Sequence, residues 1–283
     1  MERLGHLQLQ IDLIGQRKTI NMAGLKVNTI TDYISKGEKP EILFWVGCAG
    51  SFDDRAKRIT RAFIKILNKA EIKYAVLGKE ESCTGDPAKR AGNEFLFQMQ
   101  AMMNIQVLNG YGIQKIVATC PHCFNTLKNE YPELGGRYKV IHHTEFIQNL
   151  IDEGTITIEG GEFKGKKITY HDPCYLGRGN DVYDAPRALI EKLDTELVEM
   201  KRNRRRGFCC GAGGAQMFKE SEKGNKEINI DRTEEALELD PNVIATGCPF
   251  CNTMITDGVK LKNKGKDVKV LDLAELVAKA SDL

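Results

Sequence analysis

The chain has 283 residues, of which 41% are hydrophobic and 28% are charged, and its formal net charge is +2. This composition is typical of a soluble globular protein, and the length allows one large or two ordinary domains. A charge so near balance argues against nucleic acid as a partner. The N-terminal segment has no apolar core of signal-peptide length, and no stretch approaches the roughly 18 apolar residues of a membrane helix, so a cytoplasmic protein is expected.

Residues 1–40 are weakly patterned and are expected to form an N-terminal extension. Alternating apolar residues between Leu7 and Leu13 hint at one strand, and a short helix is expected over residues 29–35, before Gly37.

From residue 41 onward, short apolar runs alternate with amphipathic segments. In a first domain, residues 41–152, strands are expected at 42–46, 74–77, 116–119 and 140–142, with helices at 53–70, 88–111, just after Cys123, and at 145–151. In a second domain, residues 153–283, strands are expected at 168–171, 197–200, 243–246 and 268–271, with helices at 185–193, 224–239 and 274–280. The glycine-rich stretch 154–167 is expected to be a connector or a small hairpin. The alternation predicts an α/β protein in which each domain is a small parallel sheet flanked by helices.

The two predicted domains form an internal repeat, which is clearest in the cysteines. Cys48 and Cys174 are 126 residues apart, as are Cys83 and Cys209. Cys120 and Cys248 are 128 residues apart, as are Cys123 and Cys251. Weaker matches pair Arg61-Ala62 with Arg187-Ala188, Ala118-Thr119 with Ala245-Thr246, and Lys139-Val140 plus Glu145 with Lys269-Val270 plus Glu275. We therefore expect two pseudo-symmetric copies of one α/β domain, each with its own cysteine site.

All nine cysteines fall into these two sets. The first set is Cys48, Cys83, Cys120 and Cys123, and the second is Cys174, Cys209, Cys210, Cys248 and Cys251. Several of them follow predicted strands, where α/β sheets place their ligands. Pro121 and Pro249 suit the first turn of a helix, so each Cys-Pro-x-Cys run should lie where a strand passes into a helix. In a reducing compartment such clusters indicate metal or redox chemistry and not a disulfide framework.

Four interpretations compete for these cysteines. Buried structural cysteines would not explain two sets in the same register. A thiol–disulfide oxidoreductase needs one Cys-x-x-Cys run and leaves the other cysteines unexplained. Structural zinc suits the four cysteines of the first set, but it does not need the five of the second. Iron–sulfur ligation by thiolates from separated loops fits both sets best.

The doubled pattern of one cysteine, then Cys-Cys-Gly, then Cys-x-x-Cys resembles the cysteine-rich CCG domain in the B component of heterodisulfide reductase. The same domain occurs in the iron–sulfur subunits of glycolate oxidase, lactate utilisation and anaerobic glycerol-3-phosphate dehydrogenase. The stretches 44–51 and 81–87 look most like the soluble part of iron–sulfur oxidoreductases that pass electrons between electron-transfer flavoprotein and quinone. The resemblance covers about residues 41–283.

This resemblance implies that Cys174, Cys209, Cys210, Cys248 and Cys251 bind a noncubane [4Fe-4S] cluster. The first set departs from the pattern because Thr84 stands where the second cysteine of the pair belongs. Its four cysteines suffice for a cubane [4Fe-4S] cluster or for zinc. With one complete set, we expect an oxidoreductase subunit that relays electrons. The first alternative is a catalytic subunit that reduces a disulfide or related substrate at the noncubane cluster, and the second is a zinc-stabilised scaffold without a redox role.

The resemblance also implies partners, because relatives carry ferredoxin-type cysteine runs and membrane helices that this chain lacks. We expect ferredoxin-like or flavoprotein companion subunits in a hetero-oligomeric complex, with the chain in the cytoplasm or at the cytoplasmic face of a membrane subunit.

Several residues near the cysteines have open roles. His122 and His171 are candidate proton donors or donors of hydrogen bonds to sulfur, with simple packing as the alternative. Asp86 either contributes an oxygen ligand or shapes a turn, and Asp172 either caps a turn or orients His171. The basic run 201–206 is a solvated loop, or else it stabilises a reduced cluster or guides an acidic partner. His142 and His143 are expected to be structural, and Trp45 to belong to the core.

Overall fold

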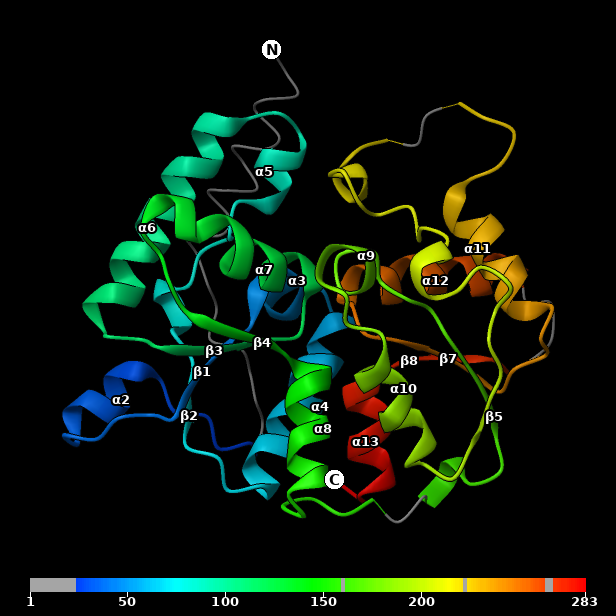
Figure 1. The fold of residues 1–283 in the computed structure, drawn as a ribbon, viewed down its shortest axis with the longest axis horizontal. Helices are drawn as coiled ribbons and strands as arrows, with labels where there is room; N and C mark the ends of the chain where they lie inside the picture. Colours follow the sequence, from blue (N-terminus) through cyan, green and yellow to red (C-terminus); the bar gives the residue numbers. More distant parts are fainter. Residues whose placement is uncertain (1–23, 159–160, 221–222, 263–266) are drawn as a thin grey trace.

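The structure is a computed structural model that describes residues 24–158, 161–220, 223–262 and 267–283. Two halves lie side by side, each built on a parallel sheet (Figure 1). The first half contains α2 (Ile30–Ser35), β1 (Ile42–Trp45), α3 (Gly47–Phe52), α4 (Ala56–Lys69), β2 (Tyr74–Ala75), α5 (Asp86–Arg90), α6 (Glu94–Gly110), β3 (Lys115–Ala118), α7 (Pro121–Asn125), β4 (Lys139–His142) and α8 (His143–Asp152). The second half contains β5 (Lys167–Tyr170), α9 (Gly177–Asn180), α10 (Asp184–Glu191), β6 (Glu196–Leu197), α11 (Ile228–Leu237), β7 (Val243–Thr246), α12 (Pro249–Lys262), β8 (Lys269–Asp272) and α13 (Leu273–Ala280).

The strand register confirms the internal repeat. The strand orders are β2-β1-β3-β4 and β6-β5-β7-β8, and every pairing is parallel. Phe44 pairs with Val117 in the first sheet, and Tyr170 pairs with Ala245 in the second. Phe44 and Tyr170 are 126 residues apart, and Val117 and Ala245 are 128 residues apart. These are the same two spacings that separate equivalent cysteines of the two sets. The proposed match of Ala118-Thr119 with Ala245-Thr246 is wrong by one residue, because Ala245 corresponds to Val117.

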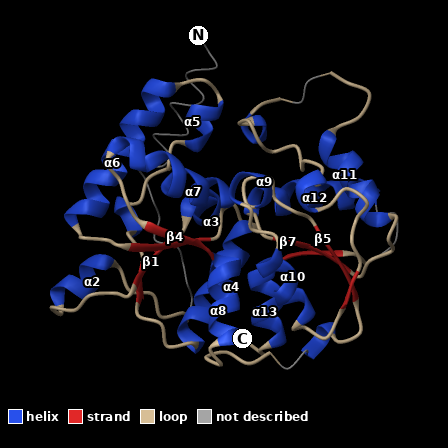
Figure 2. Cartoon of the chain, in the orientation of Figure 1, coloured by secondary structure: helices blue, strands red, loops and turns tan. Residues whose placement is uncertain are grey.

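One apolar core joins the two halves. It contains residues from β1, α4 and α8 together with residues from β5, α10 and α13, such as Phe63, Ile147, Leu189 and Leu276. Figure 2 shows these four helices between the two groups of strands. The outer face of the first sheet is covered by α6, and that of the second by α11 and α12. Because the core is continuous, the two halves are held in a fixed relative orientation.

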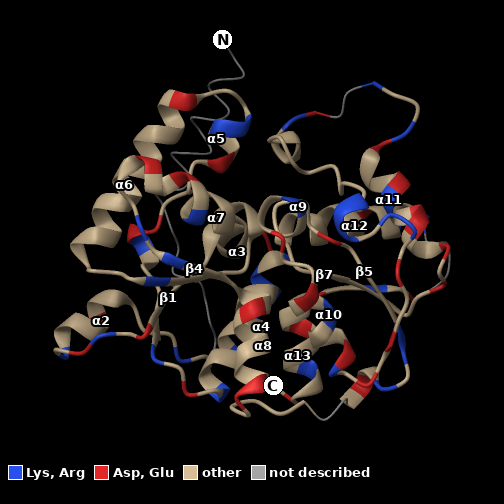
Figure 3. Cartoon of the chain, viewed as in Figure 1, with Lys and Arg blue, Asp and Glu red and all other residues tan. Residues whose placement is uncertain are grey.

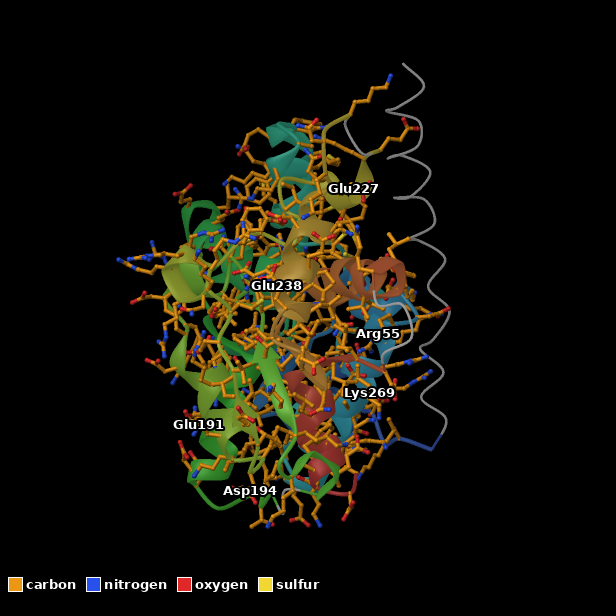
Figure 4. All side chains as sticks on the ribbon, turned by 90° about the vertical axis from the view of Figure 1, so that its right-hand side faces the viewer. Arg55, Glu191, Asp194, Glu227, Glu238 and Lys269 are labelled. Atoms are coloured by element: carbon orange, nitrogen blue, oxygen red, sulfur yellow. The ribbon has the colours of Figure 1, made fainter. Side chains whose placement is uncertain are left out.

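An ion pair closes one side of this interface. Arg55, just before α4, donates to both carboxylate oxygens of Glu275 on α13 at 2.9 and 2.7 Å. Its Nη2 also donates to the carbonyl oxygen of Val270. Figure 4 shows Arg55 and the neighbouring Lys269 on this flank of the molecule.

The predicted α/β fold, with two repeats that each carry a small parallel sheet flanked by helices, is confirmed, while several details differ. The helix expected over 88–111 is divided into α5 and α6, because Gly92 has φ +84° and Asn93 caps α6. Helix α12 was not predicted, since Gly258 and several Thr and Asn residues weaken its helical signal. No hairpin forms in the described part of 154–167, and the expected strand between Leu7 and Leu13 lies outside the described residues. Among the helices that the structure describes, none combines the length and apolar character that membrane crossing requires.

Gly258 allows α11 and α12 to approach each other closely. A Cβ atom at this position would lie 2.1 Å from Oγ1 and 2.8 Å from Cβ of Thr233. Gly258→Ala should therefore lower the free energy of unfolding by about 1–3 kcal/mol, as overpacking of a core usually does. The control is Gly110→Ala at the end of α6, where nothing lies within 4 Å, and this change should be neutral or stabilising. Urea unfolding of both variants measures the difference, and equal effects would contradict the packing argument.

Candidate metal centre

Both cysteine sets lie at the carboxyl ends of the two central strands of their sheets. Cys48 follows β1 and Cys120 follows β3, while Cys174 and Cys248 follow β5 and β7 in the same way. In each sheet the strand order reverses between these two strands. Such a switch point is where open parallel sheets bind ligands, because the chain leaves the two strands in opposite directions.

The structure brings the four cysteines of the first set together. The thiols of Cys48 and Cys83 are in hydrogen-bonding contact, as are those of Cys120 and Cys123. Thr84, which is 1% exposed, donates its hydroxyl hydrogen to Sγ of Cys123 at 3.9 Å. The threonine therefore turns toward the sulfurs.

The second set forms a continuous chain of contacts. Cys174 contacts Cys209, Cys209 contacts Cys210, and Cys210 contacts Cys251, which also contacts Cys248. All nine cysteines lie in the described part of the chain and are free thiols. Cys174 and Cys209 are partly exposed, whereas Cys210, Cys248 and Cys251 are buried.

Backbone N–H groups point at sulfurs in the same way in both halves. The N–H of Gly85 donates to Sγ of Cys83 at 3.5 Å, and that of Gly211 donates to Sγ of Cys209 at 3.2 Å. These glycines have φ of +89° and +91°, a conformation that residues with a Cβ rarely adopt. N–H donors of this kind stabilise thiolates and the sulfurs of bound clusters.

Contacts among the sulfurs divide the thiols into those that ionise easily and those that do not. The hydrogen bond from Cys174 lowers the pKa of Cys209, and the bond to Cys209 raises the pKa of Cys210 to about 12. In the first set, the thiol of Cys48 lowers the pKa of Cys83. Burial works to raise the pKa of Cys120, but hydrogen bonds from Cys123 and Cys248 outweigh it and lower that pKa.

The two sets meet where their Cys-x-x-Cys turns face each other. Cys120 of the first half is in hydrogen-bonding contact with Cys248 of the second. The middle residues of these turns also pack together, with the rings of His122 and Phe250 5.4 Å apart. Tyr175 also lies against His122, at 4.4 Å between ring centroids. The predicted location of both sites near the shared interface therefore corresponds to a direct contact between them.

The acidic residues near the cysteines have other partners. Asp86 binds His122 Nδ1 at 2.9 Å and Arg90 Nε at 3.0 Å, so both of its oxygens are engaged. The hydrogen bond with Asp86 outweighs the effect of burial and raises the pKa of His122.

Asp172 holds the loop around Cys174. It forms a buried two-bond ion pair with Arg187, and its Oδ2 also accepts the backbone N–H of Arg204. Asp172 therefore fixes the loop and does not orient His171. That alternative was wrong.

His171 is oriented by an arginine from α11. Nε of Arg232 donates to Nδ1 of His171 at 3.0 Å. Arg232 is 0% exposed and His171 is 1% exposed. Burial lowers the pKa of His171, and the charge of Arg232 lowers it further. A ring nitrogen of His171, Sγ of Cys210 and Sγ of Cys251 lie within 4.8 Å of one another.

Three of the other singled-out residues, Trp45, His142 and His143, are structural. Trp45 is buried in the core, as expected. His142 caps α8, and His143 binds Asp272 across the interface at 2.9 Å. In the basic run, Arg202 and Arg204 pair with Glu235 and Asp184, and Figure 3 shows acidic and basic residues interspersed over both halves.

The donor set fits a sulfur-ligated metal centre. Several thiols touch one another in a buried site, N–H groups point at them, and their carboxylate neighbours are already engaged. Such a set suits iron–sulfur clusters or zinc and is unsuited to magnesium or calcium, which prefer oxygen ligands. The role of each cysteine as a ligand remains a prediction.

Sequence reasoning did not identify three residues that support the site. Glu81 accepts the N–H groups of Val46 and Gly47 and so ties the loop of Cys83 to that of Cys48. Arg187 was noted only as a repeat match, and Arg232 not at all. An arginine on a helix normally indicates a solvated face, so no local signal marks these two as buried.

Known proteins are similar to this chain over most of its length. Residues 42–128 and 168–256 match the cysteine-rich domain CCG. The chain is 44% identical to the EtfAB:quinone oxidoreductase of Syntrophomonas wolfei over 87% of its own length and 35% of that protein. It is also 44% identical to the probable iron-sulfur-binding oxidoreductase FadF of Bacillus subtilis, over 90% of this chain and 36% of that protein. It is 34% identical to the D component of the dihydromethanophenazine:CoB--CoM heterodisulfide reductase of Methanosarcina barkeri, over 87% of this chain and 60% of that protein.

The fold and site define a double α/β protein with paired cysteine centres. The chain belongs to the CCG cysteine-rich domain family, as the sequence resemblance indicated. Two of these relatives are named as oxidoreductases, one of them as probably iron-sulfur-binding, and the third is part of a heterodisulfide reductase. It spans only about a third of the first two relatives' lengths.

Proposed function

We propose that this chain is the iron–sulfur electron-transfer part of an oxidoreductase complex that resembles heterodisulfide reductase. Cys174, Cys209, Cys210, Cys248 and Cys251 would hold a noncubane [4Fe-4S] cluster. The first set, Cys48, Cys83, Cys120 and Cys123, would hold a cubane [4Fe-4S] cluster or zinc. A bound iron–sulfur cluster supplies one-electron chemistry.

The contact between Cys120 and Cys248 carries this proposal. Groups held by cysteines that touch are close enough to exchange electrons without a further carrier. The buried Cys-x-x-Cys turns keep water away from this junction, and the N–H groups of Gly85 and Gly211 stabilise charge on the sulfurs. The chain itself binds, shields and tunes the two centres.

The relatives support the choice of partners. One is named for EtfAB and quinone, and another is part of a heterodisulfide reductase. A further relative, from Chromohalobacter salexigens, is named a probable membrane-anchored ferredoxin. We therefore propose a flavoprotein or ferredoxin-like donor and a complex at the cytoplasmic face of a membrane.

A second candidate is reduction of a disulfide or related substrate at the second cluster. Partial exposure of Cys174 and Cys209 favours it, because a substrate could reach these sulfurs from solvent. Turnover of a small disulfide with a chemical reductant, lost in Cys174→Ser, would favour catalysis over simple relay.

Metal analysis and EPR of anaerobically purified protein test the main proposal. We expect about four irons for each occupied cluster site. Cys210→Ser should remove the noncubane signal and leave any first-site cluster intact, and Cys48→Ser, the matched control, should do the reverse. Zinc alone at both sets would overturn the proposal. Survival of both signals in Cys210→Ser would show that the ligand assignment is wrong.

A further inference from the structure

A fully buried arginine lies behind the second cysteine set. Arg232 donates its Nε hydrogen to Nδ1 of His171, whose ring lies next to Cys210 and Cys251. Nη1 donates to the carbonyl oxygen of Arg202 at 2.8 Å and to Glu235 at 2.9 Å. Nη2 is buried and has no partner among the residues that the structure describes.

The direction of the Arg232–His171 hydrogen bond determines where the imidazole carries its proton. A guanidinium nitrogen can only donate, so Nδ1 of His171 must accept. A neutral imidazole then carries its proton on Nε2. A protonated nitrogen has no lone pair for a metal, so His171 in this state cannot complete a metal site with Cys210 and Cys251.

We propose that Arg232 is a positioning residue that holds His171 as the Nε2–H tautomer, so that the ring donates a hydrogen bond to sulfur in the second set and is not a metal ligand. This inference rests on the proposed iron–sulfur function and assigns a role within that site. Hydrogen bonds to sulfur and nearby charge are two of the means by which a protein sets a cluster's reduction potential.

The first half supports this assignment. Trp45 lies three residues before Cys48, as His171 lies three before Cys174, and the strand register makes the two positions equivalent. Trp45 is 1% exposed, and its Nε1–H has no partner in the described chain. An indole nitrogen donates hydrogen bonds but does not ligate metals. The first half therefore has a ring N–H donor that cannot ligate a metal at this position, which matches the role proposed for His171.

The free-energy cost of burying Arg232 also supports a role for this arginine at the second cysteine set. A buried charge costs several kcal/mol unless it is well paired, and an apolar residue would fill the same space more cheaply. Glu235 balances part of the charge of Arg232, but Nη2 remains without a partner in the described part of the chain. A cation beside anionic sulfur is favourable, which gives the arginine a use that packing alone does not supply.

The first test uses the unmodified protein, loaded with iron and labelled with 15N-histidine. Electron–nuclear double resonance of the second cluster should show only weak 15N coupling and a proton coupling that disappears in D2O. His171→Leu should remove that proton coupling. A 15N coupling of the size produced by direct coordination, lost in His171→Leu, would overturn the inference while leaving the iron–sulfur function intact. Absence of iron from the second set would instead refute the proposed function.

The second test measures the reduction potential of the second cluster. Arg232→Met should shift its reduction equilibrium about tenfold toward the oxidised form, which is ~59 mV for one electron. The proton coupling from His171 should also change. Arg202→Met is the matched control, because Arg202 pairs with the same Glu235 but its side chain does not touch His171. Unchanged potential and coupling in Arg232→Met would overturn the positioning role, and if that variant fails to fold, the first test still decides.

Discussion

Asp272→Ala is expected to lower the free energy of unfolding by about 2–5 kcal/mol, which combines ~1–3 kcal/mol for a buried donor left without its acceptor with ~0.5–2 kcal/mol for a lost helix cap. Asp272 and His143 are both 0% exposed and join α13 of the second half to α8 of the first. Oδ1 of Asp272 also accepts the N–H of Ala274, and its own N–H donates to Glu275, which completes a capping box at the start of α13. Alanine would leave a buried imidazole donor unpaired and the helix uncapped.

Urea unfolding under anaerobic conditions measures this effect. Asp272→Asn should cost less, because an amide oxygen can still accept from His143 and Ala274. Asp54→Ala is the control, since Asp54 is 97% exposed in its pair with Lys57, and its loss should matter little. Because Asp272 lies on the shared core, both halves should unfold in one transition at a lower urea concentration. Early unfolding of the second half alone would show that the interface is weaker than its burial indicates.

The parts of the fold that follow from local patterns were predictable. Short apolar runs such as 243–246 mark buried parallel strands, and the equal cysteine spacings revealed the repeat without knowledge of either sheet. The carboxyl ends of parallel strands then placed the sulfurs at one edge of each sheet. These inferences need only neighbouring residues and one general rule about topology.

The remaining features depend on contacts between distant segments. The approach of Cys120 to Cys248 follows from how α4 and α8 pack against α10 and α13, and no local pattern encodes that orientation. The role of Arg232 could not be predicted for the same reason, because its burial results from the position of α11 over the second sheet. One predicted role of Asp172 was wrong because its partner, Arg187, is 15 residues away on α10. Long-range packing decides which polar residues serve the site.

Thr84→Cys should give the first centre the ligand set of the second, because it supplies the missing fifth sulfur. Thr84 corresponds to Cys210, and the glycine that follows each has nearly the same positive φ. The hydroxyl of Thr84 already points at Cys123, as Cys210 contacts Cys251. A cysteine sulfur at this position would therefore face the sulfurs of the first set without any change in the backbone.

If the fifth cysteine selects the noncubane cluster, Thr84→Cys should roughly double the noncubane EPR signal for each chain, since cluster type follows the ligand set. Thr84→Ser is the matched control, because it keeps the hydroxyl but adds no sulfur and should leave the spectrum unchanged. The reciprocal variant, Cys210→Thr, gives the second set the pattern of the first and should abolish the noncubane signal while metal stays bound. A spectrum that Thr84→Cys leaves unaltered, in a protein that keeps its metal content, would mean that the surroundings of each set, and not its fifth cysteine, determine the cluster. In that case the asymmetry would lie in residues such as His171 and Trp45, which differ between otherwise equivalent positions.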